Sequence, residues 1–125
     1  MPDNSRSSTA LRIGGWLCVH LVAFFLVFLI LGKVAPECAE FYKSANFKLE
    51  PRTELVVGQA FYFRLYLLHY FVAFLAFDVA VMITLAKLWP TNQWPVYWYS
   101  HIVIMTAFIY STYAMVWLIN PIAQR

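Results

Sequence analysis

The most constraining feature of the sequence is the uninterrupted apolar run Leu65–Ala86, which lies between Arg64 and Lys87. The hydrocarbon core of a bilayer is about 30 Å thick and takes about 20 helical residues to cross. Backbone groups in lipid must form their hydrogen bonds within the segment, so a single span has to be helical. The run therefore predicts a transmembrane helix, and Asp78 places one carboxylate well inside it.

The composition supports a membrane protein that forms one structural unit over 1–125. Hydrophobic residues make up 62% of the chain and charged residues only 12%. A water-soluble chain this short could not surround such an apolar run with apolar neighbours. The net charge of +3 is spread along the chain and forms no basic stripe, which argues against nucleic-acid binding.

Two further apolar runs, Ile13–Gly32 and Val96–Ile119, predict a first and a third span. The first run is longer than the core of a signal peptide, which is about 7–15 residues, and it lacks a good cleavage site, so we expect it to be retained. The predicted fold is an all-α membrane protein with transmembrane helices at about 13–33, 54–87 and 96–119. A flexible tail at 1–12 would precede the first of them.

The segment 34–53 is the largest polar part of the chain, and we expect a solvated loop that contains a short helix. Pro36 suits the first position of that helix, and Asn46 should end it. Thr53 could serve as the N-cap of the second long helix, with Glu54 at the positive end of the helix dipole. A surface that docks another subunit is the alternative interpretation of this segment.

Part of the chain, from Val34 to about Phe71, resembles a transmembrane segment of the F-type platform proteins of type II secretion and type IV pilus systems. The resemblance rests on Val34 and Pro36, on Phe41, and on Leu49-Glu50-Pro51-Arg52-Thr53. Glu50 stands where the family has a proline beside the leucine, and the family's soluble cytoplasmic helical domains have no counterpart here. The resemblance implies a platform subunit of the bacterial inner membrane with a docking loop comprising Pro36, Phe41, Leu49, Pro51 and Thr53.

With three spans, the N-terminus and the connector Leu88–Pro95 share one side of the membrane, and Val34–Arg52 shares the other side with the C-terminus. The side that holds Val34–Arg52 carries more Lys and Arg, which the positive-inside rule would place in the cytoplasm. That segment also holds as many acids as bases, so the charge signal is weak. We therefore follow the resemblance, which implies a cytoplasmic N-terminus.

Asp78 is the sharpest candidate for a functional residue, because a charge at this depth in a bilayer costs several kcal/mol and such residues usually face a polar interior. Asp78 lies nine residues before Lys87, and His20 lies eight residues after Arg12, so both are about 12–13 Å from the same side. Thr106 reaches a similar depth on the third helix. We predict an intramembrane polar cluster of Asp78, His20 and Thr106. It would either handle protons or bind a partner, or be a structural hydrogen-bond cluster or an Asp that burial keeps protonated.

The three histidines also raise the possibility of haem, since two imidazoles can ligate one iron. His69 lies on the face opposite Asp78 and near the other side of the membrane, so only His20 and His101 could form such a pair. We expect no cofactor, and the two cysteines lack the spacing of a zinc site. The sequence contains no catalytic signature, and we predict that the protein is not an enzyme.

Small residues recur along the second span at Ala73, Ala76 and Ala80, a spacing that places them on one face of a helix. This seam would pack within the three-helix unit or dock another subunit.

The predicted function is that of a non-catalytic structural or platform subunit of a larger membrane assembly, which the resemblance would relate to secretion or pili. The alternative is an anchor subunit of a redox or proton-coupled transport complex that uses Asp78 and His20. The expected partners are the lipid bilayer and other membrane subunits or further copies of the chain.

Overall fold

A computed structural model describes residues 4–123, and this part of the chain is helical without strands. Three helices in it are long and apolar enough to cross a membrane: Ser8–Ser44, Leu67–Leu88 and Trp94–Ile122. The predicted all-α fold with three spans is therefore confirmed. The elements are α1 (Asn4–Leu29), the π-helical turn η1 (Ile30–Val34), α2 (Ala35–Ser44), α3 (Pro51–Leu65), α4 (Leu67–Leu88) and α5 (Trp94–Ala123).

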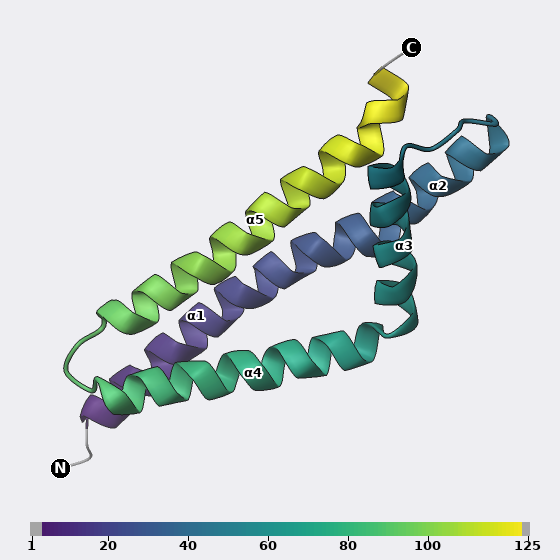
Figure 1. Ribbon diagram of the computed structural model, residues 1–125. Helices are drawn as coiled ribbons and strands as arrows, with labels where there is room; N and C mark the ends of the chain where they lie inside the picture. Colours follow the sequence, from purple (N-terminus) through teal and green to yellow (C-terminus); the bar gives the residue numbers. More distant parts are fainter. Residues whose placement is uncertain (1–3, 124–125) are drawn as a thin grey trace.

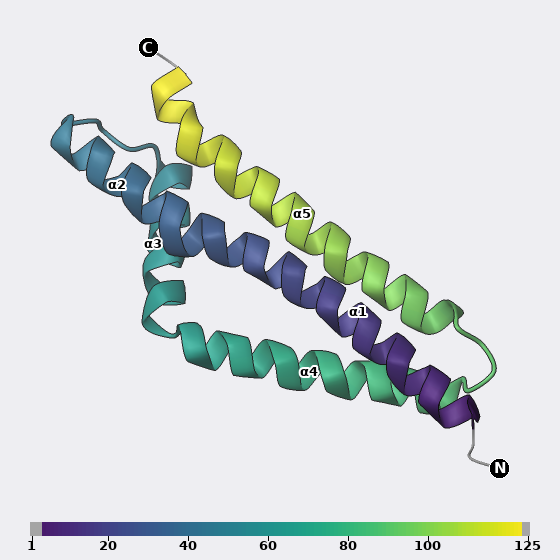
Figure 2. The ribbon, with the colours of Figure 1, turned by 180° about the vertical axis from the view of Figure 1, so that it is seen from behind.

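Helices α1 and α5 run side by side in the same direction, and α4 returns in the opposite direction (Figures 1 and 2). All three meet at the end that holds the start of α1 and the connector between α4 and α5. At the other end α4 diverges from α1, and α3 crosses the space between α4 and the junction of α1 and α2. The end of α5 lies beside the connection from α2 to α3, as the three-span topology predicts.

The first helix is much longer than predicted, because it continues through Pro36 to Ser44. A proline inside a helix cannot donate a hydrogen bond and clashes with the carbonyl four residues before it, here that of Gly32. The helix absorbs this defect in the wider turn η1, where the N–H of Ala35 bonds the carbonyl of Ile30, five residues earlier. The predicted loop at 34–53 is therefore wrong in extent, because only the residues from Ala45 to Glu50 are non-helical.

The predicted flexible tail at 1–12 is also a helix from Asn4 onward, and residues 1–3 lie outside the described part of the chain. The predicted end of the short helix is correct, since Asn46 adopts a positive φ of 54° just after α2. Asparagine tolerates this left-handed conformation better than most residues, which makes it a common helix terminator.

The second predicted helix, at 54–87, is interrupted at Tyr66, where α3 ends and α4 begins. Tyr66 has φ −113° and ψ 24°, outside the helical region, although no proline or glycine adjoins it. The cause lies in tertiary packing, because Val56, Ala60 and Phe63 of α3 are buried in a core that α4 contacts through Leu67, its first residue. Phe63 stacks on Tyr70 across the break, with ring centroids 5.7 Å apart.

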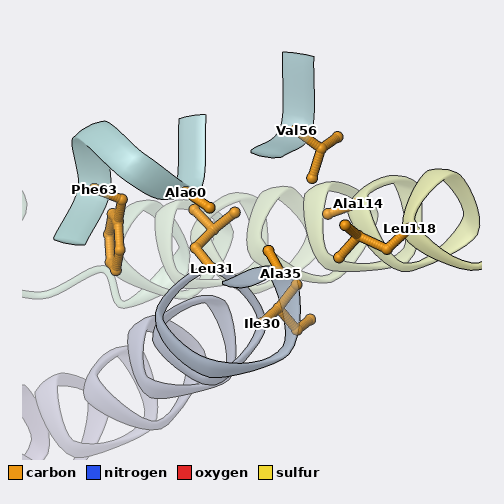
Figure 3. Close-up of a cluster of buried hydrophobic side chains, with 8 residues drawn as sticks. All are labelled: Ile30, Leu31, Ala35, Val56, Ala60, Phe63, Ala114 and Leu118. Carbon is orange, nitrogen blue, oxygen red and sulfur yellow. The ribbon is translucent and has the colours of Figure 1, made fainter. Parts of the chain in front are cut away.

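The core joins η1, α2, α3 and α5 at the end of the molecule away from the N-terminus (Figure 3). Ala35, Ala60 and Ala114 are almost fully buried there, and such small residues let helix backbones approach closely in a membrane. The cluster consists of Ile30, Leu31, Ala35, Val56, Ala60, Phe63, Ala114 and Leu118.

Polar contacts attach the end of α5 to the connection between α2 and α3. Pro121 lies inside α5 and lacks the N–H that would bond the carbonyl of Trp117. The hydroxyl of buried Thr53 donates to that carbonyl instead, at 2.8 Å, and the hydroxyl of Tyr42 donates to the next carbonyl, of Leu118. The predicted N-cap role of Thr53 is therefore wrong, because Glu50 occupies the N-cap position and the Thr53 side chain faces α5.

We predict that Thr53→Val lowers the free energy of unfolding by about 1–2 kcal/mol, because it leaves the partly buried Trp117 carbonyl without a donor. In a Pro121→Ala background the cost should fall to less than about half, since an alanine at that position restores the backbone N–H. Denaturant unfolding in detergent micelles, followed by tryptophan fluorescence, would measure both. Thr106→Val, at an exposed position, is the matched control. Equal costs in the two backgrounds would show that Thr53 does not compensate for Pro121.

Candidate intramembrane proton site

A buried imidazole–carboxylate pair joins the first and second spans. Nδ1 of His20 on α1 lies 2.9 Å from both carboxylate oxygens of Asp78 on α4. The two residues are only 0% and 1% exposed. Equal depth predicted that these two side chains could meet, and the structure brings them together.

Helix α4 approaches its neighbours along one narrow stripe. Its buried residues are Asp78 and Met82, which lie four positions apart and therefore on one face. Away from this stripe α4 exposes large apolar side chains such as Phe77, as a helix in contact with lipid does. Helix α4 is thus rotated about its own axis so that its single carboxylate points at α1 and α5.

Tyr99 of α5 completes the site, and the sequence analysis missed it. Its hydroxyl donates a hydrogen bond to Oδ1 of Asp78 at 2.9 Å, and its ring lies edge-on to His20 with centroids 5.8 Å apart. Tyr99 is near the start of the third span, where tyrosine is typical of the membrane interface. The length of the tyrosine side chain could have indicated this role, because it can place the hydroxyl deeper in the membrane than the Cα atom of Tyr99.

Thr106, predicted as the third member of the cluster, does not take part. It is exposed, whereas Ser100 on the same helix is fully buried. Six residues of helix turn a side chain through about 600°, which places Thr106 about 120° from Ser100. Equal depth was therefore correct for His20 and Asp78 but insufficient for Thr106, because the side chain must also face the interior.

The second imidazole nitrogen, Nε2 of His20, is buried and has no hydrogen-bond partner among the described residues. When Nδ1 donates to the carboxylate in the neutral imidazole, Nε2 carries a lone pair that can accept a proton. The hydroxyl of Ser100 is also buried without a partner in this part of the chain. The site therefore combines a satisfied carboxylate with an unoccupied proton acceptor.

Aromatic rings cover the site on the side of the N-terminus. The ring of Trp16, one turn before His20 on α1, lies 6.4 Å from that imidazole and 6.2 Å from the ring of His101. His101 has its Nδ1 2.9 Å from the carbonyl of Tyr97, and the two rings are 4.0 Å apart. His69 is exposed on the opposite face of α4 from Asp78, as its helical position predicts.

The alanine seam of Ala73, Ala76 and Ala80 is exposed, so its predicted packing within the three-helix unit is wrong. These alanines lie about 140–160° from Asp78 around the helix, on nearly the opposite face. Helix α4 cannot direct both sets inward, and the carboxylate has the stronger requirement because lipid cannot solvate it. Docking of another subunit to the seam remains a prediction.

The five residues of the predicted docking loop do not form one exposed surface. Phe41 and Pro51 are exposed, and Pro36 and Leu49 are partly buried. Thr53 is fully buried against α5. A partner that docks on this end of the molecule would therefore contact Phe41 and Pro51, and Thr53 would have only a structural role.

We predict that Tyr99→Phe lowers the free energy of unfolding by about 1–2 kcal/mol, because it removes a hydrogen bond to a buried carboxylate. The effect should disappear in an Asp78→Leu background, which has no acceptor. Denaturant unfolding in micelles would measure both differences. Tyr113→Phe, on the exposed face of the same helix, should be neutral. A Tyr99→Phe effect that persists without Asp78 would assign the role of Tyr99 to ring packing.

The chain was compared with protein families, curated proteins and solved structures. No family model matches it, and neither a curated protein nor a solved structure matches it. The resemblance to secretion and pilus platform proteins consequently stays a prediction.

Proposed function

We propose that this protein is a membrane subunit whose site, formed by His20, Asp78 and Tyr99, takes up and releases a proton within a larger redox or transport assembly. The observation that carries the proposal is the free Nε2 of an imidazole whose Nδ1 is held by a buried carboxylate. Intramembrane ionisable residues of this kind commonly mark proton relays.

Electrostatics favour a single proton as the occupant of the site. With neutral His20, the ionised Asp78 leaves one net negative charge in a medium of low dielectric, stabilised by the hydroxyl of Tyr99. A proton on Nε2 converts the pair to imidazolium and carboxylate, which has no net charge. The site can thus alternate between two states that differ by one proton, and each state keeps both hydrogen bonds to the carboxylate.

The same proton would influence helix packing, because each of the three spans supplies one member of the site. Loading the imidazole strengthens the attraction between α1 and α4, since a neutral donor becomes a charged one. Release of the proton weakens that contact and leaves α5 bonded through Tyr99. Proton occupancy is thereby coupled to how firmly the helices are held together at this end, which is what a proton-coupled assembly requires.

The chain is well suited to a direct test, because Asp78 is one of two aspartates and His20 one of three histidines. Protein labelled with ¹⁵N-histidine and ¹³C-aspartate would be placed in lipid nanodiscs and titrated from about pH 5 to pH 9 by nuclear magnetic resonance. We expect the imidazole signals of His20 and the carboxyl signal of Asp78 to change over one shared pH range.

In Asp78→Asn the shared step should vanish, while the signals of exposed His69 serve as the internal control. An imidazole that keeps one protonation state across the whole range, beside an unchanging carboxylate, would make the pair a purely structural cross-link. Melting temperatures of the two proteins would show that Asp78→Asn remains folded.

A second candidate is the platform role that the sequence resemblance suggests, with the N-terminus in the cytoplasm of a bacterium. The observation that favours it is the exposed ring of Phe41 near the end of α2, which joins Tyr42 and Phe47 in an aromatic group. We predict that proteins co-migrating with the native protein in mild detergent distinguish the candidates. Stoichiometric secretion or pilus components that are lost in Phe41→Ala support the platform role, whereas redox or transport subunits retained in that variant support the proton role.

A further inference from the structure

A cavity of about 530 Å³ opens at the end of the molecule where the three spans meet the N-terminus and the connector between α4 and α5. Helix α1 supplies one wall with Thr9, Arg12, Ile13 and Trp16. The end of α4, the connector and the first turn of α5 supply the rest. This cavity lies outside the proton site, although Trp16 borders both.

The lining of the cavity has the character of an anion site. Arg12 is its one charged member, and none of the lining residues is Asp or Glu. Within residues 4–123 the ion pair that the structure contains is that of His20 with Asp78, so no described carboxylate neutralises Arg12. Hydroxyls, amides and indole N–H groups add further hydrogen-bonding capacity, and the indole N–H can only donate.

The cavity lies at the depth of lipid headgroups. Arg12 precedes His20 by eight residues, which places it about 12 Å toward the membrane surface. Trp89 and Trp94 line the cavity and are 45% and 63% exposed, as expected of the aromatic belt that marks the interface. Ile13 and Val96 supply apolar wall on the same cavity. A ligand there meets a cation and polar donors together with apolar surface.

We propose that this cavity binds an anionic phospholipid, with the phosphate against the guanidinium of Arg12 and the start of the acyl chains against the apolar wall. A guanidinium binds phosphate through two parallel hydrogen bonds, which a flexible surface lysine does not match. Basic pockets between transmembrane helices bind anionic headgroups in the same way. Lipids that merely surround the protein need no such pocket. Binding in this cavity would therefore be selective for the charge of the headgroup.

The test uses the full chain in mild detergent with equal amounts of phosphatidylglycerol and phosphatidylcholine that carry the same acyl chains. Native mass spectrometry then counts the lipids that remain bound. We expect phosphatidylglycerol to be retained preferentially, and Arg12→Gln to lower its ratio to phosphatidylcholine about fivefold through the lost charge-assisted contact.

Lys87→Gln is the matched control, because Lys87 is exposed at the same membrane interface, and it does not line the cavity. It removes the same charge and should leave the ratio nearly unchanged. Equal losses in the two variants would replace the site with general surface attraction. Equal retention of the two lipids by the natural protein would overturn the proposal directly.

Two further measurements keep the result decisive. Arg12→Lys preserves the charge without the two parallel hydrogen bonds, so its ratio of phosphatidylglycerol to phosphatidylcholine should lie between those of the natural protein and Arg12→Gln. A ratio as high as that of the natural protein would contradict the guanidinium contact. This outcome can be read even if Arg12→Gln fails to fold. Inorganic phosphate is then added to lipid-free protein. If phosphate raises the melting temperature as much as phosphatidylglycerol does, and only when Arg12 is present, the occupant is a free phosphate and the lipid assignment is wrong.

Discussion

A bilayer offers no hydrogen bonds, so every polar group that this protein carries into the membrane needs a partner within the protein. That constraint is met at two places near opposite ends of the molecule. At one, His20 and Tyr99 satisfy the carboxylate of Asp78 across three helices. At the other, Thr53 and Tyr42 donate to the carbonyls at the end of α5 beside Pro121. Helix α4 buries only Asp78 and Met82, so the contact of Asp78 with His20 and Tyr99 fixes which face of α4 points inward.

The number of spans could be predicted from the sequence, because hydropathy and length are local properties that survive any arrangement of the helices. The contact between His20 and Asp78 was also within reach, since depth follows from counting residues to the nearest charge. Both predictions depend on helical rise alone. Neither requires knowledge of which way a side chain faces.

The errors concern rotation and tertiary packing. Thr106 was assigned to the interior by its depth, and the alanine seam by its spacing. A helical wheel with Asp78 facing the interior would have placed the seam on the outer face of the helix. The break at Tyr66 has no local signal, because it arises where α3 leaves the line of α4 to pack on η1 and α5. Pro36 was a misleading stop signal, since the π-helical turn before it lets the first helix continue. The role of Tyr99 in the site was missed because a tyrosine near the end of a span usually anchors the helix at the membrane interface.

The continuity of the first helix has a structural consequence. Ser8–Ser44 is one helix of 37 residues, about 55 Å long by helical rise, and a bilayer core of about 30 Å covers little more than half of it. Because no loop intervenes, α2 and the helical turn that carries His20 belong to one continuous element. The π-helical turn η1 lies between them, and its Ile30 and Leu31 anchor that element in the apolar core.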